Sequence, residues 1–438
     1  SVVYQNNGTS NVKFKQFLTV INDKITEAFP YTRFNQNIKH SNKLKLKTLN
    51  PELNQIRKEV QLLSEMYHNN PRKEILLYRN KYRAYYKKKL KNAKLSANSY
   101  HIRTSNNKSR ACWEVINSYR TKSNKNHISD INVNEFNNFF INIAEHLAGG
   151  NLHRQIQQSN LNLQDKNIPK FSFGPVSYND VGGIIDGLKN KHTVDCYGFS
   201  VSLLKQVKKQ LIEPFTNIIN ECIKDCIFPD ELKVAKVLPV FKGGDKNNVG
   251  DYRPISILPC LSKVFESILK NQIISFFESN NLFSEDQFGF RKNKNTIDAI
   301  NRLIDAVVEA MENGNYAGLI LCDLSKAFDT ISHEILLDRL TYYYGFDFQG
   351  VKLIKSYLNN RKQYTSANGI DSDCRYIRIG VPQGSVLGPV LFLIYVNELG
   401  DAVPGVETVR FADDTTLILR NHDILSLKEK MQETKYNL

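Results

Sequence analysis

The chain has 438 residues, a formal net charge of +15 and an isoelectric point near 9.3. Its length and 41% hydrophobic content suffice for more than one domain, and the excess of Lys and Arg suits a protein that binds polyphosphate. No apolar run reaches the roughly 18 residues of a membrane-spanning helix. The seven scattered cysteines lack the spacing of a zinc site or a secreted disulfide scaffold, which indicates reduced thiols in an intracellular protein.

The N-terminal third is rich in Lys, Asn and Tyr and predicts two helices. Ile56, Val60 and Leu63 have helical spacing, and Pro71 ends that run. A second helix, over residues 75–95, interleaves apolar and basic residues and contains the triplet 87–89 (KKK). One face of it could follow a phosphate backbone, although a solvated basic helix packed through its tyrosines explains the pattern equally well.

The next segments are Asn-rich and then helical. Residues 135–147 predict a helix that ends at Gly149-Gly150, and the chain from there to residue 170 has the composition of a linker. Residues 175–228 predict further helices. The sequence therefore favours a basic helical extension over residues 1–130, an Asn-rich helix and linker over residues 131–174, and a separate domain over residues 175–438.

A basic hairpin is predicted next. The apolar run 234–241 ends at Lys242, and after a polar loop comes the segment 251–256 (DYRPIS), which contains Arg253. The planar fork of an Arg suits bidentate contact with phosphate, and a Lys acts there as a point charge. The hairpin could therefore lie over a triphosphate, although a solvated surface position is the ordinary fate of either cation.

Three carboxylates follow predicted strands in the C-terminal part. Asp323 comes directly after the apolar run 317–322, and Asp413 and Asp414 lie between the strand-like runs 408–412 and 415–419. Adjacent acids repel each other, so a pair at a hairpin tip indicates a bound cation, with a solvated turn as the alternative. Three such carboxylates would hold two hard divalent ions, which is the phosphoryl-transfer chemistry of nucleic-acid polymerases.

At this point a family resemblance becomes specific. Residues 323–329 (DLSKAFD), 380–389 (GVPQGSVLGP) and 411–414 (FADD) resemble motifs A, B and C of reverse transcriptases in order and spacing. Residues 251–256 and 287–291 (QFGFR) resemble fingers motifs of non-LTR retrotransposon polymerases of the jockey and CR1 type. The resemblance implies an α/β (α+β) right-hand polymerase, with fingers over about residues 175–310 and a palm with an antiparallel sheet over about residues 311–438. It also implies a fragment that stops before the thumb.

The resemblance also implies roles for individual residues. Asp323, Asp413 and Asp414 would be the catalytic metal ligands, together with the backbone carbonyl of Leu324. They would bind two Mg²⁺ ions, for which Mn²⁺ could substitute. Phe328 resembles the steric gate that excludes a 2′-hydroxyl, its alternative being ordinary core. We expect Gln383 and Gly384 to lie at the new base pair, together with Lys242 and Arg253 as nucleotide-binding cations.

Further expectations concern neighbouring residues. Asp329 is expected to cap the following helix, predicted over residues 331–344, while His333 is assigned no role. The apolar run 386–396 is too short to span a bilayer and predicts a buried helix. Weaker candidates for nucleic-acid contact are the basic residues Arg291, Arg361, Lys362, Lys87, Lys88 and Lys89.

The implied activity is that of an RNA-directed DNA polymerase of a mobile element. Its partners would be an RNA template, a DNA primer or target and deoxynucleoside triphosphates, without a membrane. The family implies work in the nucleus after a cytoplasmic ribonucleoprotein stage. A truncated or domesticated nucleic-acid-binding remnant remains the alternative, and an RNA-templated RNA polymerase is disfavoured by Phe328 and the Pro-Gln-Gly block.

Overall fold

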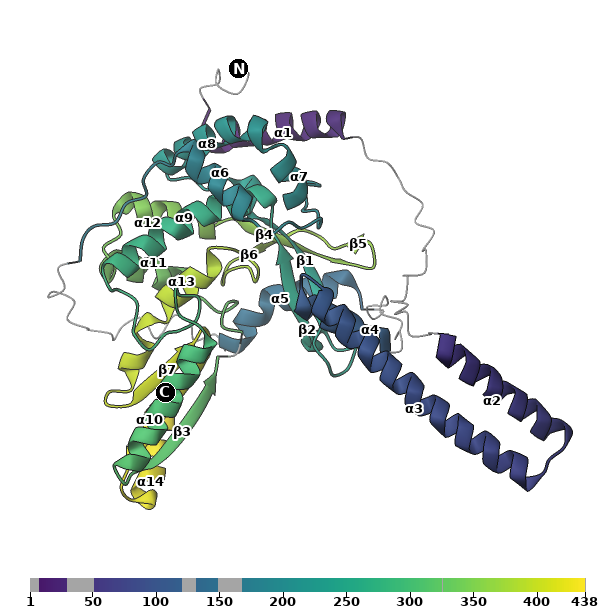
Figure 1. Ribbon diagram of the computed structural model, residues 1–438. Helices are drawn as coiled ribbons and strands as arrows, with labels where there is room; N and C mark the ends of the chain where they lie inside the picture. The colour runs from purple at the N-terminus through teal and green to yellow at the C-terminus, as the bar shows by residue number, and fades with distance from the viewer. Residues whose placement is uncertain (1–7, 30–50, 120–130, 149–167, 325, 438) are drawn as a thin grey trace. The chain divides into compact units, whose positions relative to one another are not determined.

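The computed structural model describes residues 8–29, 51–119, 131–324 apart from 149–167, and 326–437. The chain forms two compact units, one of residues 31–126 and one that combines residues 1–30 with residues 127–438. Figure 1 shows the helices and strands of both units.

The larger unit contains most of the helices and every strand among the described residues. Its α-helices are α1 (Ser10–Ala28), α5 (Val133–Ala148), α6 (Tyr178–Gly187), α7 (Val201–Gln206), α8 (Lys208–Asp225), α9 (Cys260–Ser279), α10 (Thr296–Glu312), α11 (His333–Tyr342), α12 (Phe348–Leu358), α13 (Gly388–Tyr395) and α14 (Ile424–Asn437). Its strands are β1 (Val234–Phe241), β2 (Tyr252–Ile257), β3 (Tyr316–Asp323), β4 (Arg361–Ala367), β5 (Ile370–Asp371), β6 (Arg375–Ile377), β7 (Glu407–Phe411) and β8 (Asp414–Asn421). Mixed α/β architecture is therefore confirmed.

The first sheet is built on the predicted basic hairpin. β1 and β2 are antiparallel, β4 lies parallel to β1 on its other side, and β5 and β6 both pair with β4. Alternate residues of β1 are buried, as a strand with one covered face requires. Helix α5 covers that face, and the Phe136 ring packs edge-on against Tyr252 at 4.8 Å.

The second sheet has three antiparallel strands in the order β3-β8-β7. Helix α10 packs against one face, where Ala299 and Ala306 meet Val409 and Ile418. Helix α14 packs against the other face, where Leu427 meets Leu417 and Leu419. Figure 1 shows the two helices on opposite sides of these strands. The sheet is thus held by one helix on each face.

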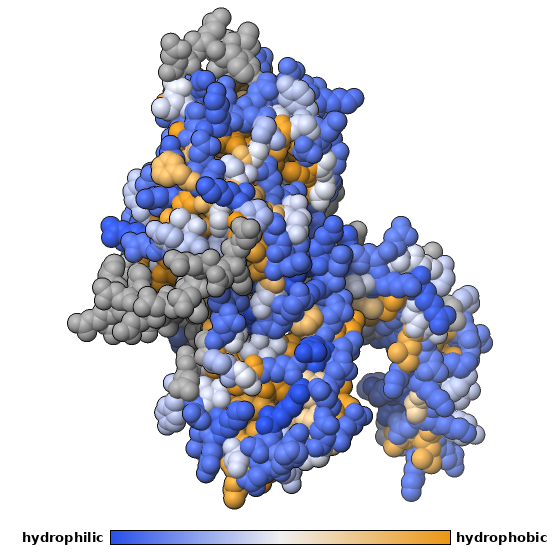
Figure 2. Space-filling view, turned by 90° about the vertical axis from the view of Figure 1, so that its left-hand side faces the viewer, coloured by the Kyte–Doolittle hydropathy of each residue, from blue (hydrophilic) through white to orange (hydrophobic). Residues whose placement is uncertain are grey.

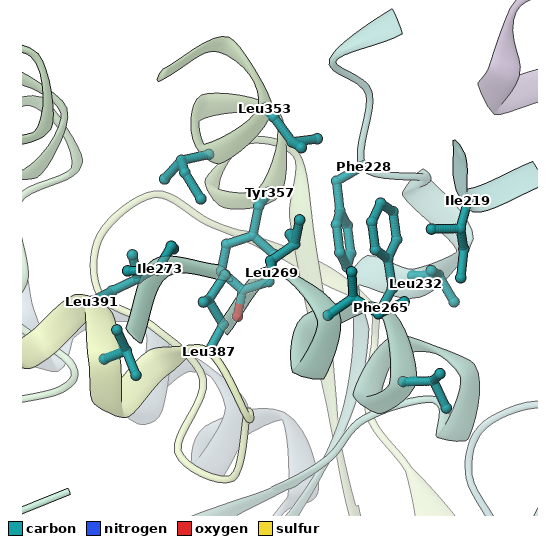
Figure 3. Close-up of a cluster of buried hydrophobic side chains, with 14 of the residues drawn as sticks. Ile219, Phe228, Leu232, Phe265, Leu269, Ile273, Leu353, Tyr357, Leu387 and Leu391 are labelled. Carbon is teal, nitrogen blue, oxygen red and sulfur yellow. The ribbon is translucent and has the colours of Figure 1, made fainter. Parts of the chain in front are cut away.

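The largest core lies among the helices that join the two sheets. Phe228 and Phe265 stack at 4.9 Å, and Tyr357 packs edge-on against Phe228 (Figure 3). Leu387 and Leu391 enter the same cluster from the α13 segment. The run 386–396 is therefore a buried helix, as predicted. Helix α1 joins this core too, because Phe17 stacks on Phe215 of α8 at 5.8 Å.

The smaller unit is helical in its described part, with α2 (Pro51–Asn69), α3 (Lys73–Thr104) and α4 (Lys108–Tyr119). The two helices predicted there are confirmed, and α3 continues past residue 95. No residue of α3 is buried. Most of the side chains on the face of the protein shown in Figure 2 are hydrophilic. None of the helices within the described ranges has the length and apolar character needed to cross a bilayer.

Candidate active site

The strand register brings two of the predicted carboxylates together. β3 ends at Asp323, β8 begins at Asp414, and these two residues are directly paired across the strands. Directly opposed residues point to the same face, with Cβ atoms about 5 Å apart. Both side chains are exposed. The end of the second sheet therefore presents two carboxylates side by side.

Asp413, the third predicted carboxylate, lies in the turn between β7 and β8. Only Ala412 and Asp413 separate the strands, and Ala412 adopts the left-handed conformation with φ of 58°. Two-residue hairpin turns require such backbone angles. The predicted Asp-Asp hairpin is therefore present, with Asp413 half-buried at its tip.

The donor chemistry at this end fits a hard divalent cation. Carboxylate oxygens are the ligands that Mg²⁺ prefers, and one or two of them commonly suffice when substrate phosphates supply the rest. Within the described ranges no three His, Cys, Asp or Glu side chains are grouped closely enough to form a metal site of their own. Asp323 and Asp414, paired and exposed at the strand end, are carboxylates of the kind that such a site, shared with a bound nucleotide, uses. Leu324, the predicted carbonyl ligand, packs its side chain against the main core.

The turn after β3 is joined to the 380–389 loop by backbone hydrogen bonds. Val381 N donates to Phe328 O at 2.8 Å, and Gly380 N donates to Ile331 O at 2.9 Å. The Phe328 ring is half-buried, 5.0 Å from the ring of Phe392 and 6.3 Å from that of Phe290. Phe328 is thus both a packing residue and a bulky ring in the turn that follows Asp323.

The 380–389 loop also contacts the first sheet. Ser256 N of β2 donates to Gln383 O at 2.9 Å. Gly384 has φ of 117°, and a Cβ at this position would lie 2.7 Å from Ser256 O. Only glycine tolerates both that angle and that approach. The loop therefore connects the second sheet (β3, β8 and β7), called the carboxylate sheet below, with the basic hairpin of β1 and β2.

Lys242 and Arg253 are exposed near one end of the hairpin. Burial lowers the pKa of Lys326 in the turn after β3; Asp329 opposes the shift, and the charges of Lys242 and Arg253 add to it. The 380–389 loop thus joins the hairpin that carries the predicted cations to the turn that follows the predicted carboxylate strand.

Residues 244–438 match the protein family described as reverse transcriptase (RNA-dependent DNA polymerase). This stretch is therefore similar to reverse transcriptase domains. The RNA-directed DNA polymerase from mobile element jockey of Drosophila melanogaster is 30% identical over 238 residues, which is 52% of this chain and 26% of the relative. The probable RNA-directed DNA polymerase from transposon X-element of the same species is 30% identical over 240 residues, 53% of this chain and 26% of the relative. The predicted resemblance is confirmed, and the matches span about a quarter of each relative's length.

The prediction for Asp329 needs correction. Asp329 does not cap the following helix, because Ser332 is the N-cap of α11 and accepts from Ile335 N. Asp329 instead accepts a hydrogen bond of 2.7 Å from Gln383 Nε2. Burial raises the pKa of Asp329 to about 6, against the opposing effects of Lys326 and Gln383. Gln383 thus directs its amide to Asp329 in this structure.

Arg361 is not on the surface, contrary to the prediction of nucleic-acid contact. Its side chain is 1% exposed, its guanidinium lies over the Tyr357 ring at 4.8 Å, and Nη1 donates to Tyr357 O. Arg291 is also occupied internally, through two hydrogen bonds to Glu278 and one to Ser284 O. Arg361 is buried, and the Arg291 side chain is only 8% exposed and makes three internal hydrogen bonds, so little of either side chain is left for a nucleic acid.

The remaining predicted cations are accessible to different degrees. Lys87 and Lys88 are exposed on α3, while Lys89 pairs with Glu52 at 2.7 Å. Lys362 lies over the Tyr376 ring at 4.8 Å.

Some residues that organise the site received no role from the sequence. Glu266 is fully buried in α9 and accepts from the backbone N–H groups of Val386 and Leu387 at 2.7 and 3.0 Å. It thereby anchors the start of α13 and the loop before it. His333 Nε2 lies 2.8 Å from Gly380 O in the same loop. The position of Glu266 inside the apolar pattern of residues 260–279 is the sequence feature that could have indicated a buried acid with a structural role.

An ion pair between buried Arg410 and partly buried Asp286 lies beside the strand that leads into the hairpin turn. Arg410 of β7 is 1% exposed, and its Nη2 and Nε donate to the two carboxylate oxygens of Asp286 at 2.6 and 2.9 Å. Burial alone would raise the pKa of Asp286, but the hydrogen bond and charge of Arg410, with hydrogen bonds from Ser284 and Thr408, outweigh it and hold that pKa below its usual range. The segment before the 287–291 motif is therefore tied to the strand that leads into Asp413.

Proposed function

We propose that the reverse transcriptase domain adds deoxynucleotides to a primer 3′-hydroxyl, copying an RNA template of a mobile element. The observation that carries the proposal is the pairing of Asp323 with Asp414 at the strand end beside the Asp413 turn. Its partners would be RNA, a DNA primer or target, and deoxynucleoside triphosphates. Copying onto chromosomal DNA would take place in the nucleus, after a cytoplasmic ribonucleoprotein stage.

Asp323, Asp413 and Asp414 would hold two Mg²⁺ ions, with Mn²⁺ as a substitute and with the Leu324 carbonyl as a further ligand. When bound, the ions would activate the 3′-hydroxyl and neutralise the leaving pyrophosphate. The chain's own contribution is positioning, because strand register fixes Asp323 against Asp414 before substrate arrives. Lys242 and Arg253 would bind the triphosphate from the hairpin, adding positive charge where negative charge develops.

Phe328 would select the sugar of the incoming nucleotide. Its ring is braced by Phe290 and Phe392, so it cannot turn aside easily for a 2′-hydroxyl. Gly384 would allow close approach of the backbone to the new base pair, and Gln383, oriented by Asp329, would lie beside it. Weaker contacts to nucleic acid would come from Lys362 and residues 87–89.

The test is extension of a DNA primer on an RNA template by the purified chain with Mg²⁺ and deoxynucleotides. We expect extension by the wild type and its loss in Asp413→Asn. Asp305→Asn is the matched control, because Asp305 is exposed on α10 and its substitution removes the same charge as Asp413→Asn. Equal extension by all three proteins, or none by the wild type, would contradict the proposal; salt-sensitive binding without extension would favour a binding remnant instead.

A further inference from the structure

Gln287 makes two hydrogen bonds with the backbone of Ala412, the residue before Asp413. Its Oε1 accepts from Ala412 N at 2.9 Å, and its Nε2 donates to Ala412 O at 3.2 Å. Oε1 also accepts from Gly289 N at 2.8 Å. Because two N–H groups point to the same atom, the orientation of the amide is determined. Gln287 is 2% exposed, so water does not compete for these bonds.

These two bonds fix both peptide planes around Ala412. The N–H belongs to the plane that Ala412 shares with Phe411, and the C=O belongs to the plane that it shares with Asp413. Holding both determines φ and ψ of Ala412, whose φ of 58° is unfavourable for a residue with a Cβ. The orientation of the Asp413 backbone follows directly from the second plane.

The surrounding backbone leaves the turn no room to move toward the 287–291 segment. A Cβ at Gly289 would lie 2.1 Å from Ala412 N. Phe288 N donates to Arg410 O, and Arg410 N donates to Asp286 O, both at 2.8 Å. Residues 286–289 therefore run along the end of β7 and enclose Ala412. The Gln287 amide is the contact that extends to the carbonyl of Ala412, next to Asp413.

We propose that Gln287 is a positioning residue for Asp413: its amide holds the Ala412 backbone so that the Asp413 carboxylate meets the cations bound at Asp323. The inference rests on the proposed function. It assigns Gln287 an action through Ala412, without contact to substrate. Only Gln combines the required reach with both a donor and an acceptor; Glu has no donor for Ala412 O, and Asn is one methylene shorter.

The chain contains a matched control. Gln272 of α9 makes the same double hydrogen bond with another backbone, since Oε1 accepts from Gly174 N at 2.9 Å and Nε2 donates to Gly174 O at 3.0 Å. Gln272→Glu removes the same chemistry from a position outside the carboxylate sheet. It therefore separates the cost of losing such a pair from an effect on the metal site.

The test is Mn²⁺ binding by the full chain in the presence of a deoxynucleoside triphosphate, followed through the electron paramagnetic resonance signal of free Mn²⁺. We expect Asp413→Asn to lose binding and Gln287→Glu to weaken it about tenfold or more, as loss of a residue that orients a metal ligand commonly does. Gln272→Glu should bind as the wild type does. Hydrogen exchange should show faster exchange in residues 407–421 of Gln287→Glu alone.

Gln287→Asn keeps the experiment decisive if Gln287→Glu does not fold. Wild-type Mn²⁺ affinity in a folded Gln287 variant, beside loss in Asp413→Asn, would overturn the inference and leave the proposed function standing. Wild-type affinity in Asp413→Asn would overturn the metal site and both proposals together.

Discussion

The carboxylate sheet and the basic hairpin hold their proposed functional residues in opposite ways. The carboxylates of β3 and β8 are fixed by strand register and supported from behind by the buried Asp286–Arg410 pair. Lys242 and Arg253 are exposed, and neither forms an ion pair within the described part of the chain. Carboxylates placed by strand register and exposed cations without a protein ion pair in the described residues suit a site in which metal geometry must be constant while a nucleotide enters and pyrophosphate leaves.

The largest expected effect is on the stability of the carboxylate sheet. Arg410→Met would leave the partly buried Asp286 without its cation, and we expect a loss of about 3 kcal/mol in the free energy of unfolding. Urea denaturation of the full chain measures it. Lys24→Met, which breaks the exposed Lys24–Glu27 pair, should leave the transition where it is. A small loss of unfolding free energy in Arg410→Met would contradict the view that the carboxylate sheet is held more firmly than the hairpin.

Sugar selection should come from the rigid side of the site. Phe328→Val would open space under the incoming sugar, and we expect ribonucleotide incorporation to rise about tenfold or more relative to deoxynucleotides. Competition between the two substrates on one template provides the measurement. Phe276→Val removes a comparable ring from the core and should keep the wild-type preference. Unchanged selectivity in Phe328→Val would mean that the ring is core only.

The hairpin cations should affect binding and not folding. We expect Arg253→Gln to raise the KM for deoxynucleotides several-fold, by about 1–2 kcal/mol of binding free energy, with an unchanged urea transition. Arg253→Lys should recover only part of the loss, because a Lys cannot make a bidentate phosphate contact. A destabilisation as large as that of Arg410→Met would show that the hairpin is no freer than the sheet.

The smallest effect is expected at Asp329, which lies between the two regions. Its pKa of about 6 is above the usual value for Asp, so the folded state binds its proton more tightly than the unfolded state does. The stability contributed by this proton is complete below about pH 4 and is lost as the pH rises through about 6. The stability of Asp329→Asn should not change with pH in this range. At pH 7.5 the variant should be more stable than the wild type, because it has no buried negative charge at this position. Parallel pH profiles of thermal unfolding would contradict the assignment.

The sequence predicted the local elements better than the contacts between them. Apolar runs predicted β1, β3 and the hairpin around Asp413, because strand formation and turn chemistry are local. The prediction that Arg361 contacts nucleic acid was wrong, because Arg361 begins β4, whose parallel pairing with β1 joins residues more than a hundred positions apart. The prediction that Asp329 caps the next helix was wrong, because Ser332 is better placed for the N-cap. The Gln287 amide reaches a residue 125 positions away, which no local pattern indicates.

The central claim is that Asp323, at the end of β3, and Asp413, in the turn between β7 and β8, serve one metal site. Single-turnover incorporation of one deoxynucleotide should be measured for the wild type, Asp323→Asn, Asp413→Asn and the double variant. If the two act as a unit, each single variant should lose about as much as the double variant. Losses that multiply in the double variant, or a single variant that retains the wild-type rate, would contradict the claim.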